Sequence, residues 1–239
     1  MKTDRPEFLP RQVKWYSAST EEELAKKLTK NIKAMYAELS LTNKRSSLAV
    51  SGGSTPINFF QKVSKLDILW SSIDITLIDD RWVEPTHKDS NEFLVRKYLL
   101  QNKAVNANFI PLKNNSNSAK DGQKELEGCL DKLKKPIDLS ILGMGNDGHT
   151  ASLFPCSDEL YLAMDIDNQN KCIAVNPKTA PYERISLTRS MINKSNNIAL
   201  YIVGEKKLET LEIAINNKDP LKMPIYAFLN KGLSIYWSP

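Results

Sequence analysis

The stretch "DLSILGMGNDGHTASLFP", residues 138–155, decides how the chain is interpreted. Its apolar first part is typical of a buried strand, and GMGNDG (143–148) then matches the G-x-G-x-x-G pattern of dinucleotide-binding turns. Two aspartates further along lie near the spacing at which such folds hold a ribose. The stretch therefore has two interpretations: a cofactor-binding turn, or a glycine loop that presents Asp147 and His149 to another ligand.

The residues that follow the pattern favour the second interpretation. A dinucleotide turn leads directly into a helix whose N-terminus receives the pyrophosphate. Here Pro155 comes seven residues after Gly148 and would break that helix in its second turn. The pattern also lies in the second half of the chain, whereas the fingerprint normally opens the first βαβ unit. We expect a loop beyond a strand end, where open α/β sheets place their ligands, and no nucleotide cofactor.

The loop carries one of only two histidines in the chain. Asp147 lies two residues before His149, close enough to fix the tautomer and orientation of its ring. A histidine held in this way can act as a general base near neutral pH. A surface or capping histidine is the alternative. A metal site is disfavoured, because the other histidine is His87 and neither has an H-x-x-x-H or cysteine partner.

A second glycine turn, SGGSTP (51–56), follows another apolar run. Gly52 and Gly53 would expose backbone N–H groups, Ser54 and Thr55 add hydroxyl donors, and a helix is expected to start at once. This pattern favours an anion cradle. It lacks the Gly-Lys-Ser/Thr of a nucleotide P-loop, so the terminal phosphate of a small metabolite fits better than a nucleoside triphosphate. A purely structural strand-to-helix turn is the alternative.

Charged residues follow two further apolar runs. DDRWV (79–83) comes directly after one of them, with Ser90 and Asn91 downstream, and such a cluster is not expected to serve solvation alone. GEKK (204–207) places two lysines just after another run. Taken alone, these lysines would be ordinary surface residues.

The periodicity of apolar residues predicts the order of the elements. Helices are expected over 20–39 with a capping box at Thr20, from Pro56, over 89–100 with Ser90 as cap, and over 122–134, 205–215 and a short segment near 224. Strands are expected to end at residue 50 and to span 73–80, 137–142, 171–175, 183–188, 197–203 and 233–237. This alternation predicts an α/β fold with a mostly parallel sheet and helices on both faces. No repeat or linker divides the chain, so we expect one domain over residues 1–239.

The composition indicates the broad class of protein. Of the 239 residues, 41% are hydrophobic and 26% charged, enough to bury a sizeable core. A net charge of +5 suits a small anionic substrate, but it is also common on proteins without one; interleaved acidic residues argue against nucleic-acid binding. Three cysteines without a C-x-x-C pair favour free thiols in a reducing compartment. Without a signal-like or membrane-spanning run, the chain is expected to be cytoplasmic and to bind no membrane.

Together these segments resemble the 6-phosphogluconolactonases of the glucosamine-6-phosphate isomerase superfamily. The resemblance extends from about residue 48 to the C-terminus. It rests, in family order, on SGGSTP (51–56), DDRWV (79–83) followed by Ser90-Asn91, GMGNDGHTASLFP (143–155), Pro181-x-x-Arg184 before ISLT, and Gly204-x-x-Lys207. The G-x-D-G-H-T-A-S-L-F-P string is highly specific, whereas SGGSTP is shared across the superfamily. Asp80 stands where many members carry Glu, a conservative departure.

The resemblance implies a modified Rossmann-like α/β fold without a nucleotide. It also implies hydrolysis of 6-phospho-D-glucono-1,5-lactone to 6-phosphogluconate, the second step of the oxidative pentose phosphate pathway, with no metal or organic cofactor. His149 would deprotonate the attacking water, Asp147 would orient His149, and Arg81 would lie near the lactone and steady an oxyanion or a hydroxyl. The expected substrate and phosphate contacts are Gly52, Gly53, Ser54, Thr55, Arg184 and Lys207.

Two other functions are alternatives to lactone hydrolysis: an isomerase and a sugar-phosphate sensor. Isomerases that deaminate glucosamine 6-phosphate resemble the chain in the glycine turn and the D-G-H core, but they usually continue with I-A-F-N-E-P, which supplies an acid for ring opening. The chain has TASLFP (150–155) instead. A sugar-phosphate sensor of a transcription regulator would need a DNA-binding module, and the roughly 20 residues before the first helix are too few for one. We expect a monomer or a small homo-oligomer.

Overall fold

The computed structural model describes residues 4–42 and 45–239, and seven strands form its main sheet. They are β1 (Lys14–Ser17), β2 (Ser46–Val50), β3 (Ile73–Leu77), β5 (Asn108–Ile110), β6 (Leu139–Leu142), β9 (Asn197–Val203) and β10 (Ser234–Ser238). Their order across the sheet is β1-β10-β9-β6-β2-β3-β5, and every neighbouring pair is parallel. The predicted α/β fold with a mostly parallel sheet is therefore confirmed.

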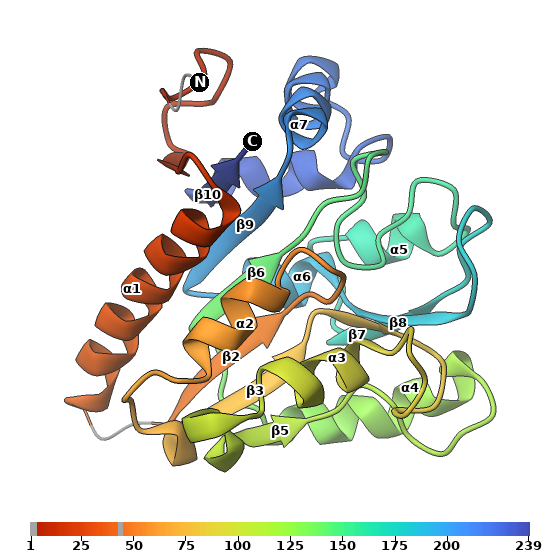
Figure 1. The fold of residues 1–239 in the computed structure, drawn as a ribbon. Coiled ribbons are helices and arrows are strands. Elements are labelled where there is room, and N and C mark those ends of the chain that lie inside the picture. Colours follow the sequence, from red (N-terminus) through yellow and green to blue (C-terminus); the bar gives the residue numbers. More distant parts are fainter. Residues whose placement is uncertain (1–3, 43–44) are drawn as a thin grey trace.

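Helices cover both faces of this sheet. They are α1 (Glu21–Ser40), α2 (Ile57–Val63), α3 (Asn91–Tyr98), α4 (Ala119–Cys129), α5 (Leu160–Met164), α6 (Arg189–Asn193) and α7 (Glu205–Asn217). Short 3₁₀ segments are η1 (Trp70–Ser72), η2 (Asn102–Asn106), η3 (Leu130–Lys132) and η4 (Pro224–Lys231). Figure 1 shows α1, α2 and α3 in front of the main sheet and α6 behind it. Among the described helices, none has the length and apolar character needed to span a bilayer.

A second sheet of three antiparallel strands corrects part of the sequence prediction. Its order is β4 (Asp79–Arg81), β8 (Arg184–Leu187), β7 (Cys172–Val175). The runs 171–175 and 183–188 do form strands, but outside the parallel sheet. The few residues that join β7 to β8 are too short for a parallel crossover, so the two strands pair as a hairpin.

The predicted strand 73–80 divides between the two sheets at Ile78. The N–H of Ile78 donates to the carbonyl of Val50 in β2 (2.8 Å), and its own carbonyl accepts from the N–H of Leu187 in β8 (2.8 Å). One residue thus bonds to both sheets. The two acids expected at the end of a single strand instead belong to β4, in the second sheet.

Two other elements differ from the sequence prediction. Strand β1 precedes the helix predicted at 20–39, in a segment where no element was expected, and its Tyr16 ring stacks on Tyr236 of β10 with centroids 4.7 Å apart. Helix α4 begins earlier than expected, because the Ser118 side chain accepts from the N–H of Asp121 (3.1 Å) and caps it. Its predicted last residues continue as η3.

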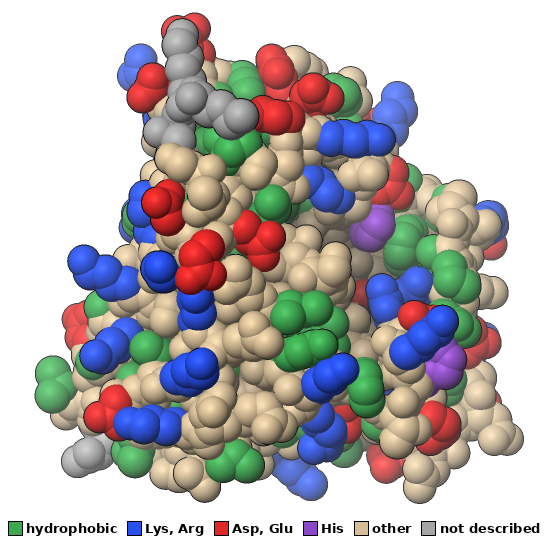
Figure 2. Space-filling model, in the orientation of Figure 1, with side chains coloured by type: hydrophobic (Ala, Val, Ile, Leu, Met, Phe, Trp, Pro, Cys, Tyr) green, Lys and Arg blue, Asp and Glu red, His purple; other side chains and the backbone are tan. Residues whose placement is uncertain are grey.

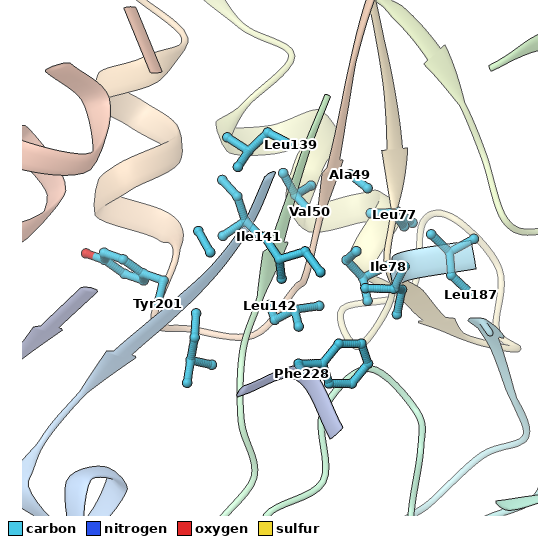
Figure 3. Close-up of a cluster of buried hydrophobic side chains, with 14 of the residues drawn as sticks. Ala49, Val50, Leu77, Ile78, Leu139, Ile141, Leu142, Leu187, Tyr201 and Phe228 are labelled. Carbon is cyan, nitrogen blue, oxygen red and sulfur yellow. The ribbon is translucent and has the colours of Figure 1, made fainter. Parts of the chain in front are cut away.

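A shared apolar cluster joins the two sheets. Figure 3 shows side chains of the main sheet meeting Leu187 of β8 and Phe228 of η4, and both of these are fully buried. Ile78 and Leu142 are also almost completely shielded from solvent. The packing therefore fixes the small sheet against the carboxyl end of the parallel strands.

Candidate active site

The loops after β2 and β6 lie at the switch point of the main sheet. From β2 the chain continues to β3 and β5 on one side, and from β6 it continues to β9 and β10 on the other. Parallel strands all end at the same edge, so the two glycine loops and the loop after β9 converge there. In open α/β sheets the crevice at such a point is where ligands bind. A cavity of about 420 Å³ occupies this place.

The cavity brings together the residues singled out from the sequence. It is lined by Gly52, Gly53, Ser54, Thr55, Arg81, His149, Arg184 and Lys207. Asp147 is not part of the lining but contacts His149, which is. Figure 2 shows both histidines on one face of the molecule, with lysine and arginine side chains between them.

The Asp147–His149 pair is formed within the loop after β6. Asp147 Oδ1 lies 2.5 Å from His149 Nδ1 and also accepts from the backbone N–H of His149 (3.2 Å). Partial burial raises the pKa of Asp147, but the hydrogen bond and charge of His149 outweigh burial, and the net pKa is lowered. Gly145 permits the arrangement, since a Cβ there would lie 2.2 Å from the imidazole ring. The chain forms no helix directly after this loop, as the sequence analysis expected.

An aromatic ring that the sequence analysis did not single out supports the histidine. Phe154 is almost completely buried, and its ring centroid lies 4.2 Å from that of His149 at an interplanar angle of 31°. The Arg184 guanidinium carbon lies 5.7 Å from the same ring centroid. Phe154 thus contacts both the imidazole and a cation of the cavity. Its position in the TASLFP segment gave no signal of this contact.

Two arginines stand side by side on the small sheet. Arg81 of β4 and Arg184 of β8 are cross-strand partners, so their side chains share one face. Within residues 4–42 and 45–239, neither lies within 4.0 Å of a carboxylate, and the Nε atom of each is buried without a hydrogen-bond partner. Burial and the charge of Arg81 lower the pKa of Arg184. Two adjacent cations that face a cavity and form no direct ion pair favour an anionic ligand.

Each arginine is held by a backbone carbonyl. Arg81 Nη1 donates to the carbonyl of Asp89 (2.5 Å), and Arg184 Nη2 donates to the carbonyl of Pro181 (2.9 Å). These bonds fix the guanidinium groups without neutralising them. Among the described residues, the second Nη atom of each guanidinium has no protein acceptor and can donate to a ligand, whereas each Nε is buried.

The loop after β2 offers backbone donors. In the part of the chain that the structure describes, the N–H groups of Gly53, Ser54 and Thr55 donate to no other protein group. Gly52 is required by close packing, since a Cβ would lie 1.9 Å from Asn91 Oδ1. The loop can therefore cradle an anion with its backbone.

The two aspartates of β4 form hydrogen bonds that connect this strand to neighbouring segments of the site. Both oxygens of the buried Asp80 carboxylate accept hydrogen bonds: from the N–H groups of Arg81 (2.7 Å), Asn91 (2.6 Å) and Glu92 (3.0 Å), and from Ser90 Oγ (3.2 Å). Burial raises the pKa of Asp80 to about 6. Asp80 therefore ties β4 to the start of α3. Asp79 lines the cavity and accepts from Ser152 Oγ (2.6 Å).

Lys207 lies beside the histidine loop. It belongs to the first turn of α7, and its Nζ donates to the carbonyl of Met144 (2.6 Å). Burial lowers its pKa, while the charge of Asp147 acts in the opposite direction. The adjacent Lys206 is exposed. Among the described residues, no group of three or more His, Cys, Asp or Glu side chains could hold a metal ion.

Comparison with known proteins gives matches over most of the chain. Residues 19–237 match the family model described as glucosamine-6-phosphate isomerases/6-phosphogluconolactonase. A 6-phosphogluconolactonase of Pseudomonas aeruginosa is 41% identical over 192 residues, which cover 80% of this chain and 81% of that protein. One of Pseudomonas putida is 34% identical over 231 residues, 97% of this chain and 95% of that protein. The crystal structure of a 6-phosphogluconolactonase from Shewanella baltica has a TM-score of 0.93 and 42% identity, covering 97% of this chain and all of the other.

Proposed function

Because the chain belongs to the family of glucosamine-6-phosphate isomerases and 6-phosphogluconolactonases, we propose that it hydrolyses 6-phospho-D-glucono-1,5-lactone to 6-phospho-D-gluconate. One observation supports this most: His149, which is paired with Asp147, faces the same cavity of about 420 Å³ as the cations Arg81, Arg184 and Lys207. A lactone hydrolase for a sugar phosphate needs a base at one end of its substrate and an anion site at the other. The His149–Asp147 pair and the cations of the cavity support assigning these two parts to this site.

His149 acts as the base in this proposal. An ionised carboxylate only accepts hydrogen bonds, so the contact with Asp147 places the hydrogen on Nδ1 and leaves Nε2 free to accept a proton. Nε2 takes a proton from water as the water oxygen adds to the lactone carbonyl carbon. The tetrahedral intermediate then collapses, the bond from that carbon to the ring oxygen breaks, and the imidazolium returns its proton to the ring oxygen. Asp147 stabilises the imidazolium between these steps.

The phosphate is assigned to the cations and the glycine loop. Gly53, Ser54 and Thr55 offer backbone N–H groups and hydroxyls, while Arg184 and Lys207 offer charge-assisted hydrogen bonds. Arg81 is assigned to the negative charge that develops on the lactone carbonyl oxygen. Its place next to Arg184 also brings the phosphate within its reach.

The isomerase is the second function within the family. Its usual I-A-F-N-E-P segment carries an acid before the proline, where this chain has Phe154 before Pro155. Phe154 stacks on His149 and offers no proton for ring opening. The relatives at 41% and 34% identity carry the lactonase name, which supports the same choice.

A paired assay tests the proposal. Freshly generated 6-phosphogluconolactone and glucosamine 6-phosphate are offered separately, with acid production and ammonia release as the readouts. We expect hydrolysis of the lactone well above its background rate and no ammonia. Ammonia release without lactone hydrolysis would favour the isomerase instead.

No metal takes part in the proposed reaction, because a positioned base and fixed cations suffice for an activated ester carbonyl. Activity is expected to survive exhaustive dialysis against EDTA. The measurement compares the dialysed enzyme with samples to which Mg²⁺, Mn²⁺ or Zn²⁺ is returned. Loss of activity that one of these ions restores would contradict a metal-free mechanism.

A further inference from the structure

Two segments far apart in the sequence meet beside Arg81 and Arg184. Tyr182 precedes β8, and its hydroxyl donates to Asp89 Oδ2 (3.0 Å) in the loop between β4 and α3. The ring of His87, from the same loop, lies edge-on to the Tyr182 ring with centroids 5.7 Å apart. The backbone of Tyr182 has φ +69°, a left-handed conformation that a tyrosine adopts only at a cost. Local contacts must therefore hold this residue in place.

Three carboxylates, those of Asp79, Asp80 and Asp89, act on the charge of Arg184, and only the Asp89 side chain is not buried. Its backbone carbonyl already accepts from Arg81 Nη1, and its negative charge acts on Arg184. Its side chain is 40% exposed and is not committed to a buried contact. Even so, its carboxylate pairs with neither guanidinium in the described structure but bonds to the Tyr182 hydroxyl.

The charges of this cluster affect one another. The hydrogen bond to Asp89 is the main reason why the pKa of the Tyr182 hydroxyl is raised, and Arg81 and Arg184 act on that pKa in the opposite direction. The hydroxyl therefore lies within electrostatic reach of the carboxylate and of both cations. An internal carboxylate at this place would compete with an anionic substrate.

We propose that the Tyr182–Asp89 hydrogen bond is a clasp that holds the Asp89 carboxylate away from Arg81 and Arg184 and so keeps both guanidinium groups free for an anion. Tyr182 is then a positioning residue for the anion site. This inference rests on the proposed function, since it takes the anion to be the phosphate of the substrate.

Removing the hydroxyl tests the clasp. In Tyr182→Phe the Asp89 carboxylate is released and can pair with Arg81. We expect the Kd for 6-phosphogluconate, measured by calorimetry, to rise about three- to tenfold. The reason is that a partly exposed ion pair between Asp89 and Arg81 would compete with the ligand. The matched control is Tyr161→Phe on α5, whose side chain is exposed, and its Kd is expected to equal that of the wild type.

A double variant separates the clasp from a merely structural role. Asp89→Asn removes the competing charge, keeps an oxygen for the Tyr182 hydroxyl, and is expected to bind at least as tightly as the wild type. If the clasp works by restraining the carboxylate, Tyr182→Phe combined with Asp89→Asn restores the affinity that Tyr182→Phe alone loses. If Tyr182 only shapes the loop, the double variant stays as weak as the single one.

The outcomes distinguish this inference from the proposed function. A wild-type protein that binds neither 6-phosphogluconate nor inorganic phosphate would overturn the anion site, and the clasp with it. A wild type that binds, together with an unchanged Kd in Tyr182→Phe or no recovery in the double variant, overturns the clasp alone. Recovery in the double variant, at unchanged Tm, is the expected result.

Discussion

The two histidines of the chain each have an aspartate two residues away, yet the two pairs are built differently. In the loop after β6, His149 Nδ1 lies 2.5 Å from the Asp147 carboxylate. In the loop after β4, His87 Nδ1 accepts from the backbone N–H of Asp89 (3.1 Å), and the Asp89 carboxylate is 3.8 Å away. The same ring nitrogen is a donor in one pair and an acceptor in the other.

This difference decides which histidine can serve as a base. At His149 the carboxylate fixes the hydrogen on Nδ1, so the lone pair belongs to Nε2, on a ring that lines the cavity. At His87 the lone pair on Nδ1 is already used by a backbone N–H. D-x-H and H-x-D thus share residue types and spacing, but the partner of Nδ1 is a carboxylate in the first pair and a backbone N–H in the second.

The largest difference in kcat is expected when each histidine is removed in turn. His149→Ala is expected to lower kcat by about 10²–10⁴-fold, the usual contribution of general-base catalysis. His87→Ala is expected to keep a kcat close to that of the wild type. Initial rates with fresh lactone, after subtraction of the spontaneous hydrolysis, measure both. A nearly normal kcat in His149→Ala would remove this residue from the mechanism.

The partner carboxylate gives the next largest effect. Asp147→Asn keeps a hydrogen-bonding group but loses the charge that selects the tautomer and steadies the imidazolium, so kcat should fall less than in His149→Ala. Combined with His149→Ala, it should cost almost nothing more, because groups that act as a unit are not additive. The same rate measurements on the two single variants and the double variant test this. Effects that simply multiply would show that the two residues act independently.

A third comparison concerns the two adjacent lysines. Lys207→Ala removes the charge-assisted contact proposed for the phosphate, so KM should rise by an equivalent of about 1–3 kcal/mol while kcat changes little. Lys206→Ala is the matched control, because its side chain is exposed, and its KM should stay near the wild-type value. Saturation curves for both variants measure the difference. Equal efficiency of the wild type on unphosphorylated gluconolactone would contradict a phosphate site altogether.

The smallest effect expected is a dependence of affinity on pH. Burial lowers the pKa of Lys207 in the free protein, so this side chain loses its charge at lower pH than an ordinary lysine. In the proposed site only the charged form of Lys207 would attract the phosphate, and affinity should therefore fall as the pH rises toward the alkaline range. Lys207→Arg keeps its charge there and should flatten the curve. Calorimetric titration with 6-phosphogluconate between about pH 7 and 10 compares the two proteins.

Much of the fold and of the site could be predicted from the sequence. Continuous apolar runs, separated by helical segments, predict the parallel strands, because strands buried on both faces of an α/β sheet are apolar along their whole length. The glycine loops at 51–56 and 143–148 could be placed at strand ends, and parallel strands bring such ends to one edge. The proximity of His149 to the glycine loop at 51–56 follows from local pattern and topology alone.

Other contacts depend on pairing that local sequence does not encode. Arg81 and Arg184 are 103 positions apart and meet only because β4 and β8 pair antiparallel in one particular register. The stacking of Phe154 on His149 depends on a turn without regular structure. Strand β1 is four residues long and gains its stability from β10, at the other end of the chain.

The number of residues between β3 and β4 determines the face of the small sheet to which the Arg81 side chain points. Side chains along a strand alternate between its two faces, and Ile78 is the single residue that separates β3 from β4. Inserting one residue after Leu77 would turn Arg81 to the opposite face of the small sheet, away from Arg184, while leaving the composition of the cavity almost unaltered. Inserting two would restore its direction but move it along the strand. The length of this junction is therefore as much a determinant of charge placement as the identity of the arginine itself.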